Sequence, residues 1–394
     1  MPRAQQRVDP KLKEWATESQ AKYIDAVNQH GSFREASRKL GVNVNAVRGQ
    51  VKAAETKAAI CGYSPQHDMR RAVPEPFVVK GVSTYYDEEG KVRGQWVKSK
   101  LDEAKAAEAV KEFVRFLVKD AKGLSPSIKP PAHSNSDLLA VYPMGDPHFG
   151  MYAWAKETGA DFDLTEAERL TQAAIDRLVS SAPAAKTALL LSLGDFFHAD
   201  NNSAATPASG HKLDVDSRFA KVQQVGLRAM RHAIQRLLEK HEAVHVWMMP
   251  GNHDPHASYA LALALDAFFD NQPRVTIDLS PSLYKYMRFG KVLIGAHHGH
   301  AAKFGQLPLI MATDRSEDWG STAFRYWYCG HIHHKTVDKE HPGVMVETFR
   351  TLAAPDAYAA GAGYRAGRDM CLIVQHAKFG EVERHRCDIA MIDR

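Results

Sequence analysis

Apolar and polar positions follow two different patterns along the chain. From residue 138 onward, short apolar runs alternate with stretches of helical periodicity, and long helices are expected over 165–180 and 214–240. Short apolar runs separated by helices are typical of buried strands in a layered α/β domain. The runs lie at 138–142, 188–193, 243–249, 292–295 and 326–329. We therefore expect an α/β domain over residues 138–394.

The first segment of the chain instead carries apolar residues at helical spacing. A helix is expected over residues 19–29. Ser32 and Glu35 have the spacing of a capping box, which predicts a second helix that begins there and ends at Gly41. Asn43 is placed to cap a third helix.

The third helix is amphipathic. Its apolar positions are expected to face inward: Val44, Val47 and Val51. Polar and basic residues lie mostly on the outward side and are candidate DNA-binding residues: Asn45, Arg48, Gln50 and Lys52. Residues 33–51 resemble the helix-turn-helix of small phage and transposase DNA-binding domains. The alternative is a three-helix bundle that packs on another part of the protein.

A hairpin and a helix are expected to follow this module. Strand-like alternation over 77–98, with acidic turn residues at 87–90, predicts the hairpin. It would be either a wing of the DNA-binding module or a small structural ribbon. Residues 101–122 form an amphipathic pattern, whose apolar stripe would pack in a core or form the seam of a homodimer or larger oligomer.

The next segment has the composition of a linker. Residues 123–136 contain three prolines and four serines, which is typical of a connection between domains. The expected division of the chain is a helix-turn-helix-like basic domain (1–71), a hairpin plus helix connector (72–122), a linker (123–137) and the α/β domain (138–394).

Charge and histidine are distributed unevenly, which supports this division. The 394 residues carry a formal net charge of +5, while residues 1–71 alone hold 13 Lys and Arg against 7 Asp and Glu. Of the 20 histidines, 17 follow residue 137. We therefore expect a basic binding module joined to a metal-binding module.

Membrane and disulfide features are not predicted. The apolar runs are all shorter than the roughly 18 residues that a membrane span needs, and the first residues lack the apolar stretch of a secretory signal. The cysteines are far apart and form no Cys-x-x-Cys pair: Cys61, Cys329, Cys371 and Cys387. The expected location is the cytoplasm, with no membrane partner.

Metal-ligand residue types follow each of the five apolar runs. The five clusters are Gly145-Asp146-Pro147-His148, Gly194-Asp195, Gly251-Asn252-His253-Asp254, His297-His298-Gly299-His300 and Gly330-His331-Ile332-His333. Sites in open α/β sheets form at the carboxyl ends of strands, so the five clusters are expected to meet in one crevice. The glycines would let the backbone turn sharply and approach the metals.

This order of clusters resembles the calcineurin-like metallophosphoesterase superfamily, whose pattern is D-x-H, GD, GNH(D/E), H and GH-x-H. The resemblance covers residues 138 to about 340 and implies a layered β-sandwich flanked by helices, with two divalent metal ions. It implies a first ion held by Asp146, His148 and His333 and a second held by Asn252, His298 and His331. Asp195 would bridge the two ions.

The resemblance also implies catalytic roles. His253 would protonate the leaving oxygen or stabilise the transition state, and Asp254 would orient it through a hydrogen bond. Among three neighbouring histidines we assign His298 as the ligand, because the family pattern places the ligand before a glycine. His297 would then point into the sheet.

Further candidates lie around these clusters. The polar loop after Asp195 would either contact substrate or be a solvated surface, and the candidate substrate-binding residues are His198, Asn201 and His300. Residues 361–367 hold three glycines, but their spacing differs from that of a dinucleotide-binding fingerprint.

The sequence therefore predicts a two-metal phosphodiesterase acting on DNA, most simply a nuclease guided by its N-terminal module. The chemistry is in-line attack on phosphorus with both ions holding the phosphoryl oxygens. Manganese is the expected metal, with iron, zinc or magnesium as alternatives. The arrangement of domains resembles metallophosphoesterases encoded by bacteriophages and prophages. The alternative functions are a small-molecule phosphodiesterase or phosphatase acting on cyclic or signalling nucleotides, and a non-catalytic DNA-binding regulator.

Overall fold

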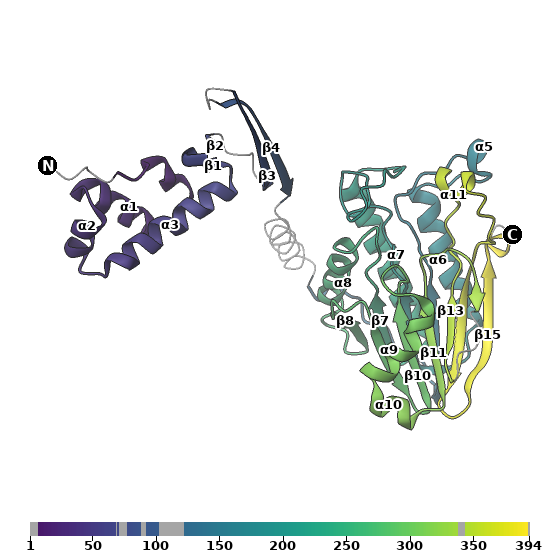
Figure 1. Ribbon diagram of the computed structural model, residues 1–394. Helices are drawn as coiled ribbons and strands as arrows, with labels where there is room; N and C mark the ends of the chain where they lie inside the picture. Colours follow the sequence, from purple (N-terminus) through teal and green to yellow (C-terminus); the bar gives the residue numbers. More distant parts are fainter. Residues whose placement is uncertain are drawn as a thin grey trace. The chain divides into compact units, whose positions relative to one another are not determined.

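In a computed structural model the chain forms two compact units, Met1–Glu112 and Phe113–Arg394 (Figure 1). The structure describes residues 7–67, 69–70, 77–87, 92–101, 122–337 and 343–392. The helix expected over 101–122, with its dimer seam, therefore lies almost wholly outside the described residues. The same holds for most of the turn expected at 87–90.

The first unit begins with four short helical segments around a small apolar core. They are η1 (Pro10–Trp15), α1 (Glu18–His30), α2 (Phe33–Leu40) and α3 (Val44–Ile60). Its core contains Ile24, Val27, Ala36, Val47, Val51 and Ala54. The three helices expected from the sequence are present, but Val44 is only partly buried beside the buried Val47 and Val51.

The helix ends differ in one detail from the expectation. Ser32 accepts a hydrogen bond from the Glu35 N–H at 3.2 Å, but the Glu35 carboxylate bonds to Arg38 at 2.8 Å instead of closing a capping box. A complete capping box opens α1, formed by Thr17 and Gln20. The second helix was therefore predicted correctly with half of its proposed cap.

Two antiparallel strand pairs complete the first unit. β1 (Tyr63–Ser64) pairs with β2 (Met69–Arg70), with η2 (Pro65–His67) between them. β3 (Phe77–Tyr86) pairs with β4 (Val92–Leu101). The predicted hairpin is confirmed, and its second strand extends to Leu101.

The second unit contains two sheets. The six-stranded sheet has the order β15-β14-β5-β6-β7-β8 and the five-stranded sheet has the order β12-β13-β11-β10-β9. The strands of the first sheet are β5 (Asn135–Met144), β6 (Ala185–Ser192), β7 (Ala243–Met248), β8 (Val275–Asp278), β14 (Asp369–His376) and β15 (Gly380–Asp388). Those of the second are β9 (Lys285–Phe289), β10 (Val292–His297), β11 (Phe324–Cys329), β12 (Thr336–Val337) and β13 (Met345–Thr348).

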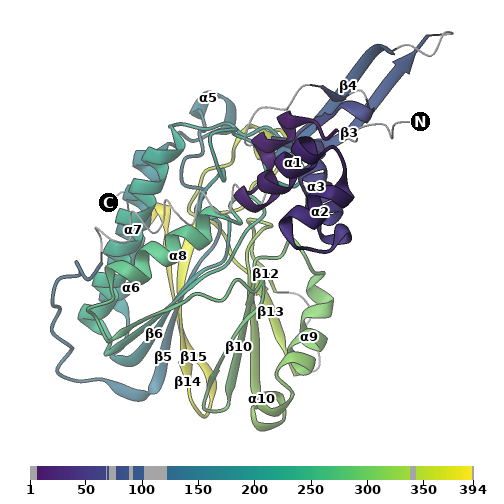
Figure 2. The ribbon, with the colours of Figure 1, turned by 90° about the vertical axis from the view of Figure 1, so that its left-hand side faces the viewer.

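Helices cover the outer faces of both sheets (Figure 2). On the side of the six-stranded sheet lie α6 (Leu164–Ser181), α7 (Phe219–Lys240) and α8 (Ala257–Phe268). On the side of the five-stranded sheet lie α9 (Leu307–Asp314) and α10 (Ser316–Ser321). The shorter segments are α5 (Ala155–Thr158), α11 (Ala357–Gly361), η3 (Phe304–Gln306) and η4 (Ile389–Met391).

The two sheets and the helices outside them form four layers. This arrangement follows from the alternation of side chains along each strand, since successive residues face opposite sides of a sheet. In β5, Leu139 and Val141 pack in the core between the sheets, while Ala140 and Tyr142 pack against the helices. Ile294 of β10 contributes to the core between the sheets from the other side. The expected layered α/β architecture with flanking helices is thus present.

One helix boundary differs from the expected one. Helix α7 begins at Phe219 rather than at residue 214, because residues 214–218 make other backbone hydrogen bonds. The Asp216 N–H donates to Gly150 and the Asp214 carbonyl accepts from Tyr152. These bonds fasten the segment to the chain that follows β5.

The segment before β5 lies against α8. The N–H groups of Gly123 and Ser125 donate to the carbonyls of Ala267 and Phe268 at 2.9 and 3.1 Å. Among the described residues, no helix combines the length and apolar composition needed to cross a membrane.

Candidate metal centre

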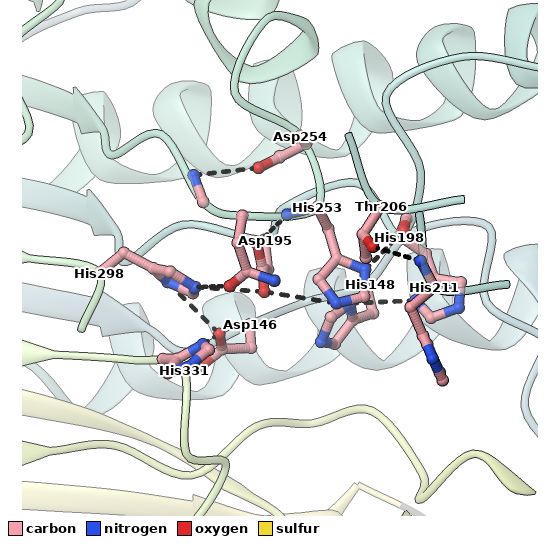
Figure 3. Close-up of polar contacts among 12 residues, drawn as sticks. Asp146, His148, Asp195, His198, Thr206, His211, His253, Asp254, His298 and His331 are labelled. Atoms are coloured by element: carbon pink, nitrogen blue, oxygen red, sulfur yellow. Dashed lines mark hydrogen bonds and ion pairs between the residues drawn. The ribbon is translucent and has the colours of Figure 1, made fainter. Parts of the chain in front are cut away.

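The seven predicted ligands all follow strands that run in parallel. Three of these strands, β5, β6 and β7, are neighbours in one sheet, and the other two, β10 and β11, are neighbours in the second. After them come Asp146, His148, Asp195, Asn252, His298, His331 and His333. Because parallel strands end at a common edge, these side chains are brought together from five separate segments. Figure 3 shows Asp146, His148, Asp195, His298 and His331 in this arrangement.

The donor atoms form two groups at distances suited to metal coordination. In the first, Nε2 of His148 lies 3.0 Å from Nε2 of His333, near Asp146. In the second, Nε2 of His298 lies 3.2 Å from Oδ2 of Asp195. Two ligands at right angles on an ion, with bonds of about 2.1 Å, are about 3.0 Å apart. The spacing and the nitrogen and oxygen chemistry therefore fit divalent transition metals.

Asn252 and His331 complete the second group. The side-chain oxygen of Asn252 lies 3.1 Å from Nε2 of His298. His331 groups with Asp195 and His298, all with donor atoms within 4.8 Å of one another. A carboxylate, an amide oxygen and two imidazoles thus converge on one point.

Main-chain carbonyls fix the tautomers of two histidines. Nδ1 of His298 lies 2.7 Å from the Leu193 carbonyl, so Nδ1 keeps its proton and Nε2 is the nitrogen that would release its proton to bind a metal. Nδ1 of His253 lies 2.8 Å from the carbonyl of His198, which leaves its Nε2 3.9 Å from Oδ2 of Asp195. His298 is therefore prepared for ligation.

The backbone at the centre adopts conformations that L-residues avoid. Among the described non-glycine residues the positive φ angles belong to Asp146, His148, Asp195, Ala204, His331 and His333, between 41° and 72°. All except Ala204 are predicted ligands. Such conformations cost about 1–3 kcal/mol each and persist where the surrounding structure imposes them. Strain is thus concentrated at the residues that would hold metal.

Glycines next to the ligands leave no room for a side chain. A Cβ atom on Gly251 would lie 2.0 Å from Oδ1 of Asp195, and one on Gly330 would lie 2.7 Å from Oδ2 of Asp146. Gly194 has a φ of +99°. The sharp turn expected of these glycines is found at Gly194, whereas Gly251 and Gly330 are needed for close approach.

Burial and mutual charge set the ionisation of the two carboxylates. Burial raises the pKa of Asp146 to about 7. Burial also opposes ionisation of Asp195, but the neighbouring His298 and His253 outweigh it and hold its pKa well below the usual value. For His298, burial alone would lower the pKa, but Asp195 and Asp146 raise it to about 9. A cation is therefore favoured between these groups.

The other imidazoles are held neutral. Burial is the main cause that lowers the pKa of His331 and of His333 to about 4, and it lowers that of His148 further below the usual value. Metal ligation requires the neutral imidazole. These three side chains are in that form at neutral pH.

Asp254 has a different role from the expected one. Its carboxylate is fully buried and accepts hydrogen bonds from the N–H of Phe197 at 2.9 Å and of Gly251 at 3.2 Å. Within the described residues it makes no hydrogen bond to His253, whose Nδ1 instead contacts the main chain of His198. Asp254 therefore fastens together the loops that follow β6 and β7.

The candidate substrate residues lie in three different settings. His198 is buried, with Nδ1 3.2 Å from Nδ1 of His148 and its ring stacked on that of His253. It therefore lies beneath the centre and not at its mouth. Asn201 lines a separate cavity of about 350 Å³. His300 is exposed, with its ring centroid 5.2 Å from that of His298.

His297 points away from the ligands, as expected. It is buried and its ring stacks on Tyr284 at 4.8 Å, in the layer beneath α9. The candidate DNA-binding residues lie in the other unit, where all four are exposed on α3: Asn45, Arg48, Gln50 and Lys52.

Comparisons with known proteins give only distant likenesses. No family model and no curated protein matches the chain. A predicted phosphoesterase from Streptococcus pneumoniae TIGR4 aligns with 64% of this chain and 99% of its own, at 11% identity and a TM-score of 0.27. The structure of PhoD aligns with 54% of this chain and 45% of its own, at 10% identity and a TM-score of 0.23. Both scores are too low to assign a fold or function.

Proposed function

We propose that the second unit is a two-metal phosphodiesterase. The observation that carries this proposal is the convergence of two donor groups at one edge of two sheets, with Asp195 between His298 and His148 (Figure 3). The first ion would be held by Asp146, His148 and His333, and the second by Asn252, His298 and His331. Asp195 would contribute to both.

The donor set suits manganese, with iron, zinc or magnesium as alternatives. Two divalent ions held by these residues would supply a deprotonated water at neutral pH and positive charge against the phosphoryl oxygens. The protein's contribution is to fix the geometry. The buried carboxylates and the strained turns hold the donors before substrate arrives.

His253 is the candidate proton donor to the leaving oxygen. Its main-chain N–H donates to Oδ1 of Asp195 at 2.8 Å, and its Nδ1 is held by the His198 carbonyl. The ring is therefore fixed with Nε2 directed toward the centre. A histidine that is positioned but not needed as a ligand suits general acid catalysis.

DNA is the proposed substrate, and the first unit supports this choice. Its exposed α3 residues carry two cations, Arg48 and Lys52. On the hairpin, Ser83 pairs with Trp96 and Gly94 with Tyr85, which places both aromatic rings on one face. Trp96 is 64% and Tyr85 59% exposed. Exposed aromatic rings and exposed cations in one unit are features of proteins that stack nucleobases and contact phosphates.

The test uses chelator-treated protein supplied with manganese. Bis-p-nitrophenyl phosphate and labelled single- and double-stranded DNA are the substrates, and His253→Ala controls for a contaminating nuclease. Cleavage of DNA and ester, both lost in the variant, would support the proposal. Hydrolysis of the ester with intact DNA would keep the metal centre and replace DNA by a small-molecule substrate. No hydrolysis of any substrate would reject the phosphodiesterase.

The DNA-binding part has its own test. The double variant Arg48→Ala/Lys52→Ala is expected to bind DNA more weakly and to reduce the slope of log affinity against log salt by about 2. Ester hydrolysis should be unchanged, because both residues lie in the other unit. If the variant bound DNA with the affinity and salt dependence of the wild type, the proposal that α3 contacts DNA would be rejected.

A further inference from the structure

A cavity of about 260 Å³ opens beside the candidate ligand His333. It is lined by the loop after β13 and by residues 363–368, which follow α11. Its lining includes Thr351, Ala353, Ala354, Tyr364, Arg365 and Arg368.

The inner end of this cavity is connected to the metal centre by a hydrogen bond and by a shared residue. The Thr351 hydroxyl donates to the main-chain carbonyl of Asp146 at 2.6 Å and accepts from the Ala353 N–H at 2.8 Å. His333 is one of the residues that line the cavity, and its Nε2 lies 3.0 Å from Nε2 of His148. A group in the cavity would therefore lie directly next to a phosphate at the centre.

The walls combine small apolar side chains with an aromatic ring and cations. Ala353 and Ala354 are buried and give the lining of the cavity an apolar part. Tyr364 is 57% exposed at the rim. Burying a planar ligand against such surfaces is favourable, and an exposed tyrosine ring gains a stacking partner.

The two arginines differ in how they are held. Arg368 donates from Nε and a terminal nitrogen to the Leu352 carbonyl at 2.9 and 2.6 Å, so it is part of the wall. Arg365 is exposed and donates from one terminal nitrogen to the carbonyls of Ala360 and Tyr364. Arg365 and Tyr364 both line the cavity, and the exposed guanidinium suits a phosphate or a nucleobase edge.

We propose that this cavity binds an unpaired nucleoside attached to the scissile phosphate. Its base would stack on Tyr364 and Arg365 would contact the polar edge or the next phosphate. Pockets for drug-sized ligands have volumes of about 300–1,000 Å³. This cavity is smaller, so it accommodates one nucleoside and not a base pair. This inference rests on the proposed phosphodiesterase and specifies the substrate class.

The experiment compares two esters that differ only in the nucleoside, thymidine 5′-(p-nitrophenyl phosphate) and methyl p-nitrophenyl phosphate, with manganese-loaded protein. Tyr364→Ala is expected to lower kcat/KM for the thymidine ester about tenfold, through KM, and to change that for the methyl ester less than about twofold. The matched control is Tyr358→Ala, which removes a 63% exposed ring that packs on His211 outside the cavity. Equal effects on both esters, or equal effects of the two variants, would overturn the proposal.

A binding measurement separates this proposal from the phosphodiesterase itself. Thymidine 5′-monophosphate should bind wild type and bind Tyr364→Ala about tenfold more weakly by calorimetry, even if neither ester is hydrolysed. Absence of hydrolysis together with this difference would reject the phosphodiesterase and retain the cavity. Absence of nucleotide binding to wild type would reject the cavity.

Competition identifies the source of the nucleoside. An oligothymidylate that inhibits hydrolysis of the thymidine ester more strongly than the same strand in a blunt duplex supports an unpaired strand of nucleic acid. Inhibition by the mononucleotide alone supports a free nucleotide. Equal inhibition by duplex and single strand contradicts the unpaired nucleoside.

Discussion

The metal centre and the outer surface of α3 are both polar clusters, but they are built very differently. At the centre, Asp146 and Asp195 are buried, and both have a positive φ angle. On α3, Arg48 and Lys52 are exposed on an ordinary helix. Buried charge and strained backbone are costly, so their presence indicates a specific chemistry. An exposed helix face costs nothing and is compatible with many partners.

The difference also determines what each region specifies. The Asp146 carboxylate accepts from the His331 N–H at 2.9 and 3.0 Å, and the Asp195 carboxylate accepts from the His253 N–H at 2.8 Å. These bonds fix donor positions to within the tolerance of metal coordination. On α3 the side chains of Arg48 and Lys52 are exposed to solvent, so affinity there depends on charge and on the partner's shape.

The largest effect is expected for Asp195→Ala. Because this carboxylate lies between both donor groups, its loss should release metal and lower phosphodiester hydrolysis more than about 10³-fold. The check is metal content by atomic spectroscopy together with hydrolysis of the generic ester.

The matched control for this change is Asp214→Ala, which removes an exposed carboxylate from the loop before α7. It should keep both metal and activity. An Asp195→Ala protein that stays fully metallated and active would contradict the proposed metal centre, because the cluster would then behave like an ordinary polar surface.

His253→Ala is expected to have the next largest effect. The side chain is fixed by the His198 carbonyl and lies outside both proposed ligand sets, so metal content should remain while kcat falls about 10²- to 10⁴-fold. Esters with a good leaving group should be affected least, because they need little protonation. Loss of metal in this variant would instead make His253 a ligand, in agreement with its closeness to His148 and His198.

Of the two regions compared, the metal centre at the strand ends could be predicted from the sequence to a large extent. Five buried strands appear as apolar runs because both of their faces are covered, and each ends in a cluster of ligand types. Strands β14 and β15 were not predicted. Most residues of β15 are polar or charged, among them Glu381, Glu383 and Arg384, so no apolar run marks this strand.

Contacts between loops were the part that the sequence could not supply. The role of Asp254 depends on the main-chain N–H groups of Phe197 and Gly251, which no residue pattern encodes. The burial of His198 beneath His148 likewise depends on how two loops pack. A further sign was available for His198, since it follows Asp195 by three residues in a loop that was already assigned to the site.

The burial of neutral histidines also distinguishes the second unit, and His241 allows a test away from the metal. Its Nδ1 lies 2.7 Å from the Ala185 carbonyl and its Nε2 2.9 Å from the Tyr142 hydroxyl. Burial lowers its pKa to about 4. Since an unfolded histidine has a pKa of about 6.5, its stabilising contribution is present above pH 6.5 and is lost as the pH falls toward 4.

The integrated contribution of His241 over that range is about 3 kcal/mol. In His241→Gln, the free energy of unfolding should therefore decrease less steeply between pH 6.5 and 4, measured by urea titration of metal-free protein. The variant is expected to be less stable than wild type at pH 7 and to approach it in acid. Parallel curves for the two proteins would contradict the buried neutral state.

The smallest effect is expected from Gly49→Ala, which places a methyl group on the exposed side of α3. A Cβ atom there would meet no atom within 4 Å, and Gly49 has no positive φ. Alanine favours helix over glycine by about 0.5–1 kcal/mol, so α3 amides should exchange hydrogen more slowly, while metal content and ester hydrolysis stay unchanged. The same change at Gly251 would put the methyl group 2.0 Å from Oδ1 of Asp195 and should release metal. If Gly251→Ala left metal content and ester hydrolysis unchanged, as Gly49→Ala should, then the close packing around Asp195 would not be needed for metal binding.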